Sequence, residues 1–92
     1  MSKASLRIGE IARLLGVTPK TVRHYHKLEL IPEPVRSEGG YRLYSPADLF
    51  HLRRIRRLQS LGLSLQQIKF ILDDDNPDEL LRTTLEGLYS EL

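Results

Sequence analysis

The sequence predicts a small, mainly helical domain that carries one β-hairpin. Three observations favour this fold. Apolar residues recur at helical spacing in several segments, capping residues and prolines mark helix starts, and a segment interrupted by two prolines leads into a glycine pair. With 92 residues and no cysteine, the chain can form one domain, without disulfides or thiolate metal ligands.

The first two helices are predicted to form a helix-turn-helix. In the first, apolar residues repeat at helical spacing at Ile8, Ile11, Ala12 and Leu15. Gly16 ends that helix, and Thr18 and Pro19 provide the N-cap and first residue of a second helix, which ends near Lys27 or Leu28. Two short helices joined by a tight turn with glycine define the motif.

A hairpin, or wing, is predicted next. The stretch "IPEPVRSEGGYRLYS" contains two prolines, which exclude a helix, and its "EGG" supplies the positive φ values of a hairpin turn. The following "YRLY", residues 41–44, has the composition of a short strand. The predicted fold class is therefore mainly α, a winged helix-turn-helix.

Three further helices complete the predicted fold. Ser45 and Pro46 start the third helix, whose apolar stripe is Leu49, Leu52, Ile55, Leu58 and Leu61. Ser64 starts the fourth, with Gln67 in capping-box spacing. Asn76 precedes a fifth, in which leucines recur at coiled-coil spacing at Leu81, Leu85, Leu88 and Leu92.

Charge is divided unevenly along the chain. The formal net charge is only +2. Residues 1–72 carry 13 Lys and Arg against 5 Asp and Glu, whereas residues 73–92 carry 1 against 7, so the two parts have net charges of +8 and −6. Many small basic domains bind no polyanion, but a basic body of this strength favours nucleic acid as partner.

The second helix is predicted to present a basic stripe. At 100° per residue, one sector of about 100° contains Lys20, Arg23, His24 and Lys27. Val22 and Tyr25 face the other way, toward the body of the domain. A helix of this size fits the major groove of DNA, where Lys and Arg reach guanine acceptors or phosphates. A solvated charged face is the alternative, and the position on a helix-turn-helix favours DNA.

The pair of histidines in "RHYH" does not predict a metal site. His24 and His26 lie about 200° apart on a helix, His51 lies on another helix, and cysteine is absent. The acidic run at residues 73–75 lacks the spaced ligands of a calcium loop. No nucleophile motif or glycine-rich phosphate loop is present either. We therefore expect no metal, no cofactor and no enzymatic activity.

The wing and the third helix supply further donors. The wing carries Arg36, Tyr41, Arg42 and Tyr44, which can donate to phosphates beside the groove that a helix fills. Alternatively, one of the two tyrosines packs the hairpin onto the core. The third helix carries four arginines on more than one side, of which one or two are expected to contact the DNA backbone: Arg53, Arg54, Arg56 and Arg57.

In this order, these segments resemble the DNA-binding domain of the MerR family of bacterial transcription regulators. The resemblance covers residues 7–72, and its most specific parts are "IGEIARLLGVTPKTVRHY", "EGGYRLYS" and "LRRIRRLQSLGLSLQQIKFIL". The family usually has an aromatic residue at the position of His24 and an acidic one at that of His26.

The resemblance implies a function and an assembly. Residues 1–75 would form the winged helix-turn-helix DNA-binding domain, and residues 76–92 would begin a dimerisation helix. Family members act as homodimers on inverted-repeat promoter operators and distort the DNA so that RNA polymerase can engage it. C-terminal segments sense an effector in the family. Recognition-helix contacts carry over to Lys20, Arg23 and Tyr25, and wing contacts to Arg36, Tyr41 and Arg42.

The residues and the resemblance together give two candidate sets. The dimer interface is expected at Leu81, Leu85, Leu88 and Leu92. The DNA contacts are expected at Thr18, Lys20, Thr21, Arg23, His24, Tyr25, Lys27, Arg36, Gly40, Tyr41, Arg42, Tyr44, Arg53 and Arg54.

Other functions stay open at this point. An architectural or excisionase-like accessory protein would bend DNA without responding to an effector, and a protein-interaction module would use the leucine stripe. The N-terminus has no signal peptide and no apolar run is long enough to span a membrane, so we expect a cytoplasmic protein.

Overall fold

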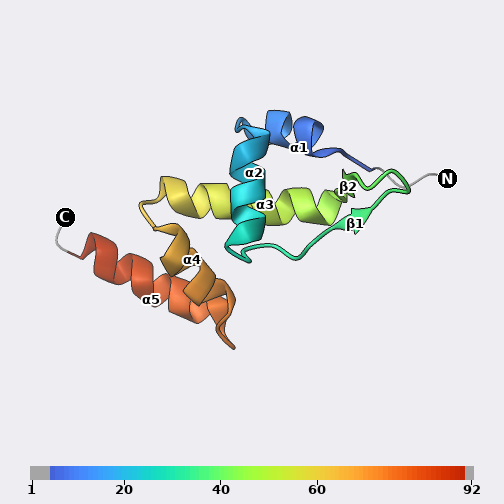
Figure 1. Ribbon diagram of the computed structural model, residues 1–92. Coiled ribbons are helices and arrows are strands. Elements are labelled where there is room, and N and C mark those ends of the chain that lie inside the picture. Colours follow the sequence, from blue (N-terminus) through green and yellow to red (C-terminus); the bar gives the residue numbers. More distant parts are fainter. Residues whose placement is uncertain (1–4, 91–92) are drawn as a thin grey trace.

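The computed structural model describes residues 5–90, which form five helices and one two-stranded hairpin (Figure 1). This confirms the mainly helical fold with a wing. None of the described helices is both long and apolar enough to cross a bilayer. The elements are α1 (Ile8–Leu15), α2 (Pro19–Lys27), β1 (Val35–Arg36), β2 (Arg42–Leu43), α3 (Pro46–Ser60), α4 (Leu65–Leu72) and α5 (Pro77–Tyr89).

The helices begin at the capping residues expected from the sequence. The Thr18 side chain accepts a hydrogen bond from the Thr21 N–H at 3.2 Å. Ser45 and Ser64 each form a reciprocal capping box with the residue three positions later. Gly16 ends α1 in the left-handed conformation, with φ 72°. Local hydrogen bonds therefore fix where these helices start and stop.

The end of α2 uses a residue that rarely occupies its conformation. Glu29 has φ 60° and is the one non-glycine residue with positive φ in residues 5–90. The Leu30 N–H donates to the Tyr25 carbonyl at 3.0 Å, and the Glu29 N–H donates to the His26 carbonyl at 3.0 Å. These two bonds are those of a Schellman helix end, whose left-handed position is usually glycine. The helix end is closed at a cost in backbone strain.

The wing contains an additional chain segment that the sequence did not predict. β1 and β2 pair antiparallel, with Val35 opposite Leu43. Tyr44 forms an isolated antiparallel bridge with Leu6, with N···O distances of 2.9 and 2.7 Å. The strand predicted over residues 41–44 is therefore shorter, and its last residue pairs with the N-terminal segment instead of with β1.

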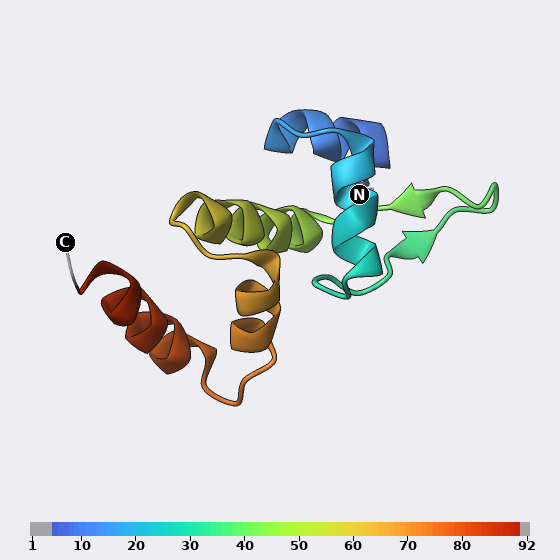
Figure 2. The same cartoon turned by 60° about the vertical axis from the view of Figure 1, so that its left-hand side comes forward.

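The core is built from buried residues of α1, α2, α3 and α4 and of the segments between them. α1 packs against α2 and α3, α3 against α4, and α4 against α5. The predicted inward-facing residues of α2, Val22 and Tyr25, are confirmed as buried. α5 contributes no fully buried residue. The wing and α5 project from opposite ends of the molecule, with α3 between them (Figure 2).

Candidate nucleic-acid interface

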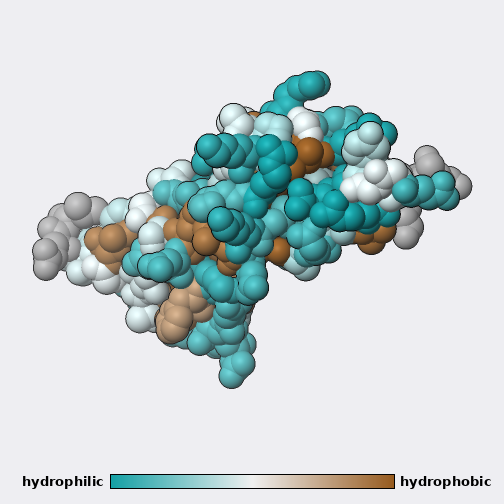
Figure 3. Space-filling model, in the orientation of Figure 1, coloured by the Kyte–Doolittle hydropathy of each residue, from teal (hydrophilic) through white to brown (hydrophobic). Residues whose placement is uncertain are grey.

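The exposed face of α2 carries the predicted basic stripe. Lys20, Arg23, His24 and Lys27 are all exposed. They line one groove of about 520 Å³, which also includes Arg56 of α3. In residues 5–90, none of the ion pairs involves a cation of this stripe. The surface over α2 is accordingly hydrophilic (Figure 3), and its cations are available to an anionic ligand.

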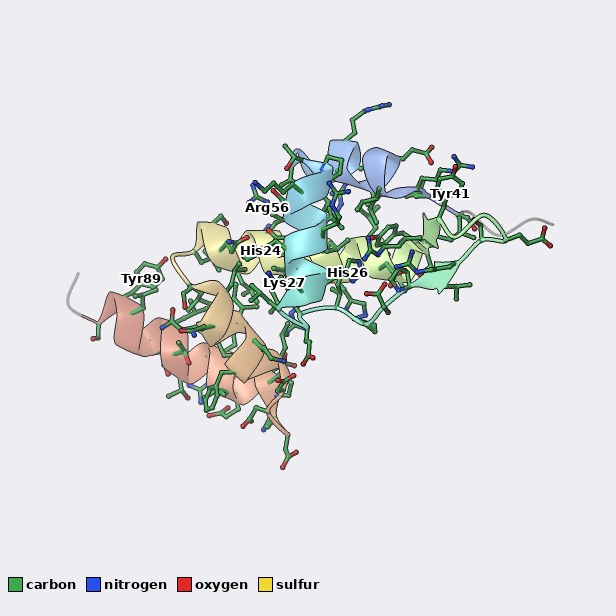
Figure 4. All side chains as sticks on the ribbon, in the orientation of Figure 1. His24, His26, Lys27, Tyr41, Arg56 and Tyr89 are labelled. Atoms are coloured by element: carbon green, nitrogen blue, oxygen red, sulfur yellow. The ribbon has the colours of Figure 1, made fainter. Side chains whose placement is uncertain are left out.

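The two histidines of α2 lie on opposite sides of the helix, as the helical wheel predicts. His24 is exposed in the groove, whereas His26 is 9% exposed. Figure 4 shows His24 and Lys27 on one side of α2 and His26 on the side toward the hairpin. Within residues 5–90, no cluster of three or more potential ligands is placed to hold a metal ion.

Tyr25 fixes α2 from below. Its ring is 1% exposed, and its hydroxyl donates to Gln59 Oε1 of α3 at 2.6 Å. Tyr25 is also among the residues that line the groove of the basic stripe, and its hydroxyl already has a partner on α3. At the start of α2, the hydroxyls of Thr18 and Thr21 are hydrogen-bonded to each other at 3.1 Å.

The wing arginines are held by a carboxylate. Arg42 Nε donates to Glu33 Oε1 at 3.2 Å, and Arg36 Nη2 donates to the same oxygen at 3.4 Å. The hydrogen bond from Arg42 lowers the pKa of Glu33, which therefore stays ionised. Arg36 Nη1 also donates to the carbonyl of Gly40 at 2.8 Å, which ties β1 to the hairpin turn. Glu33 is not a predicted site residue: its contact with Arg42 joins positions nine residues apart, although Arg36 lies only three residues away.

The two wing tyrosines have different environments. Tyr41 is 55% exposed, and the Arg7 guanidinium lies over its ring at 4.4 Å. Tyr44 is 1% exposed, and its hydroxyl lies 2.8 Å from His26 Nε2. Burial raises the pKa of Tyr44 to about 12. The alternative in which one tyrosine packs the hairpin onto the core is confirmed for Tyr44.

The arginines of α3 divide between two sides. Arg56, one of the four α3 arginines considered as DNA contacts, lines the α2 groove, although the expected contacts of this helix are Arg53 and Arg54. Its signal was available: Arg56 follows the buried Leu52 by four residues and so lies only about 40° from it. Arg54 points elsewhere and donates to Asp78 of α5 at 3.3 Å. Arg53 is exposed, outside the residues that line the groove.

Some of the leucines expected at a dimer interface pack against helices of their own chain. Leu81 and Leu85 are half-buried and pack against the core. Leu88 is 44% exposed. The Tyr89 hydroxyl donates to the carbonyl of Leu61, which joins the end of α5 to the end of α3. Leu92 lies outside the described residues, and the dimer interface stays a prediction.

A basic recognition helix on a helix-turn-helix, flanked by a hairpin with exposed donors, is the arrangement of winged helix-turn-helix DNA-binding domains. Residues 6–75 match the family described as MerR HTH family regulatory protein. The chain belongs to this family.

Similar proteins agree with this assignment. The HTH-type transcriptional regulator ZntR of Escherichia coli K12 is 47% identical over 66 residues, which are 72% of this chain and 47% of ZntR. The N-terminal part of MtaN, the Bacillus subtilis multidrug transporter activator, has a TM-score of 0.79 at 33% identity, covering 94% of this chain and 83% of that one.

A third similar structure contains nucleic acid. HiNmlR, a MerR family regulator lacking the sensor domain and bound to promoter DNA, has a TM-score of 0.68 at 25% identity and covers 96% of this chain and 78% of that one. The chain spans about half the length of the curated relatives that it matches, between 47% and 55% for ZntR and the mercuric resistance operon regulatory protein of Bacillus cereus.

Proposed function

We propose that the chain is the DNA-binding part of a sequence-specific transcription regulator, with α2 as its recognition helix. The observation that carries this proposal is the exposed stripe of Lys20, Arg23, His24 and Lys27, whose cations have no acidic partner in residues 5–90. The promoter-bound state of the similar HiNmlR supports it.

Each part of the interface has a separate role in this proposal. Lys20 and Arg23 lie in the first half of α2 and read base edges in the major groove, as residues near the start of a recognition helix do. Lys27 and Arg56 lie farther back in the groove and contact phosphates. The exposed Tyr41 and the wing arginines contact the backbone beside the groove. The buried Tyr25 and Tyr44 hold α2 and the wing in place rather than donating to DNA.

The assembly follows the family pattern in this proposal. Two copies pair through α5, and each reads one half of an inverted repeat. The dimer distorts the promoter so that RNA polymerase can engage it. The partly exposed leucine face of α5 supports the pairing, because an apolar helix face of this size is common at interfaces between subunits.

The test removes two cations of the basic stripe at exposed positions, where substitution leaves the core intact. A duplex is first selected from a random pool by the wild-type chain, and its affinity is then measured for Lys20→Ala combined with Arg23→Ala. We expect a loss of about a hundredfold, because each specific contact contributes about 1–3 kcal/mol. The control is Arg13→Ala combined with Arg57→Ala, which removes the same charge from exposed sites outside the groove that form no ion pair in residues 5–90. Equal losses in both double variants would contradict the proposal.

Transcription in vitro separates a regulator from an architectural protein that uses the same interface. A regulator changes the output of a promoter that contains its selected site, and the Lys20 and Arg23 double variant does not. DNA bending without any change in promoter output would favour the architectural function.

A further inference from the structure

The carboxylate of Glu33 contacts both arginines of the wing and also lies near His26 of α2. Glu33 lies in the segment that joins α2 to β1, and its side chain is 58% exposed. Its Oε1 accepts from Arg36 and Arg42 at 3.4 and 3.2 Å, while its Oε2 lies 3.9 Å from His26 Nδ1. The three partners come from β1, β2 and α2.

The buried ring of His26 has one nitrogen without a hydrogen-bond partner among the described residues. Its side chain is only 3% exposed, and its Nε2 is engaged with the Tyr44 hydroxyl at 2.8 Å. Its Nδ1 is the one buried side-chain nitrogen or oxygen without a hydrogen-bond partner in residues 5–90. A buried polar atom left unpaired costs free energy, and Glu33 Oε2 lies 3.9 Å from it, beyond hydrogen-bond distance.

Phosphate binding by the wing would change the position of Glu33. Glu33 occupies one guanidinium nitrogen of each arginine, Arg36 Nη2 and Arg42 Nε, so other N–H groups remain for a phosphate. A phosphate bound to these guanidinium groups brings a second anion close to Glu33, and the two anions repel each other. Because the Glu33 side chain is exposed and belongs to a segment without regular structure, it can rotate away from the wing.

We propose that Glu33 is a positioning residue that exchanges partners on DNA binding. In the free protein it holds Arg36 and Arg42 at the wing. When these arginines bind phosphates, it turns inward and accepts a hydrogen bond from His26 Nδ1. The wing then remains tied to α2 through His26, Tyr44 and Glu33. The exchange rests on the proposed DNA-binding function. It couples DNA binding to the uptake of a proton by His26.

The direction of the proton linkage follows from the groups that face His26. These are Glu33 from the loop, Arg36 and Arg42 from the wing strands, Tyr44 beside β2, and Asp48 from α3. Burial lowers the pKa of His26 in the free protein. A closed hydrogen bond to the Glu33 carboxylate, with the arginines turned toward DNA, favours the imidazolium and raises that pKa. DNA affinity should therefore increase as pH falls through the pKa of the bound form, and level off below that of the free form.

The first measurement is the affinity for the selected duplex at pH 8 and pH 6. Wild-type affinity should increase by about fivefold more on acidification than that of Glu33→Gln. The matched control is Glu38→Gln, which makes the same charge change at an exposed hairpin residue that forms no ion pair in residues 5–90. It should keep the wild-type pH dependence.

The second measurement is the pKa of the His26 ring by NMR, free and bound to the duplex. It should rise on binding in the wild-type chain and in Glu38→Gln, and rise much less in Glu33→Gln. An equal rise of the His26 pKa in all three proteins would mean that the negative charge of DNA alone causes it. This result would overturn the exchange of partners by Glu33. A wild-type chain that prefers no DNA sequence would instead overturn the proposed function, so the two failures are distinguishable.

Discussion

α2 and α5 begin alike but are stabilised in different ways. Both start after a polar N-cap side chain, Thr18 in one and Asn76 in the other, and both have proline in the first turn. α2 then buries Val22, Tyr25 and His26 in the core, whereas α5 buries no residue fully. Most of α2's stability therefore comes from tertiary packing.

α5 combines partial packing of its leucines against the core with contacts within the helix. Arg82 pairs with Glu79 and with Glu86, one turn before and one turn after it. The hydroxyls of Thr83 and Thr84 donate to backbone carbonyls four residues earlier. α2 has no such pairs in the described residues, and acidic neighbours would stabilise it only by neutralising the cations of its basic stripe. A helix anchored on one side can keep its other side free for a ligand, while α5 keeps a partly exposed apolar face.

The largest expected effect comes from removing the Tyr25 side chain, which packs α2 against the core. Tyr25→Ala should lower the free energy of unfolding by about 3–5 kcal/mol, because it leaves a cavity and an unpaired Gln59. Leu88→Ala should cost less than about 1 kcal/mol, because that side chain is 44% exposed. Urea denaturation followed by circular dichroism measures both. Similar losses in the two variants would contradict the distinction between the helices.

The second prediction concerns the face of α5. In the proposed dimer, Leu88→Asp places a charge on the exposed part of the leucine face and should weaken self-association by about tenfold or more. Thr83→Asp makes the same charge change on the exposed side of α5 and should leave association unchanged. Sedimentation velocity over a range of concentrations gives the comparison, with circular dichroism to check folding. A wild-type chain that stays monomeric on its selected duplex would contradict an α5 interface.

The same comparison shows what local sequence can predict. The helix boundaries and the outward face of α2 follow from capping residues and the 3.6-residue period, which act within one or two turns. The burial of Tyr44, its bond to His26 and the bridge of Tyr44 to Leu6 depend on segments far apart in the chain. A helical wheel gives the direction of Tyr25 but not the partner of its hydroxyl. The position of Arg56 four residues after Leu52 indicates its side of α3, but only the structure shows that it lines the groove with α2.

Long-range packing also changes the interpretation of the leucine stripe. The spacing of Leu81 and Leu85 predicts a seam for a second helix, and sequence alone does not tell which helix covers it. In the structure α4 of the same chain covers part of these side chains. The remaining exposed part, including Leu88, is what a second copy would bury.

The smallest predicted effect lies at the end of α2. Glu29 has φ 60°, where a side chain costs about 1–2 kcal/mol. Glycine removes this strain but loses more entropy on folding, by about 0.5–1 kcal/mol, and Glu29→Gly also removes an exposed 4.0 Å contact with Lys69. Lys69 keeps its closer partner Asp73 at 3.1 Å. The net gain in unfolding free energy should be about 0.5 kcal/mol.

Two further variants decide whether strain is the cause of that gain. Glu29→Gln removes the charge but keeps the Cβ, so it should give no stabilisation. Gly16→Ala introduces a Cβ at the equivalent end of α1, where φ is 72°, and should destabilise by about 1 kcal/mol. If Glu29→Gly and Glu29→Gln had the same effect, the charge of Glu29 and not its backbone would be responsible. DNA affinity should be unchanged in Glu29→Gly, since Glu29 lies outside the groove that the basic stripe lines.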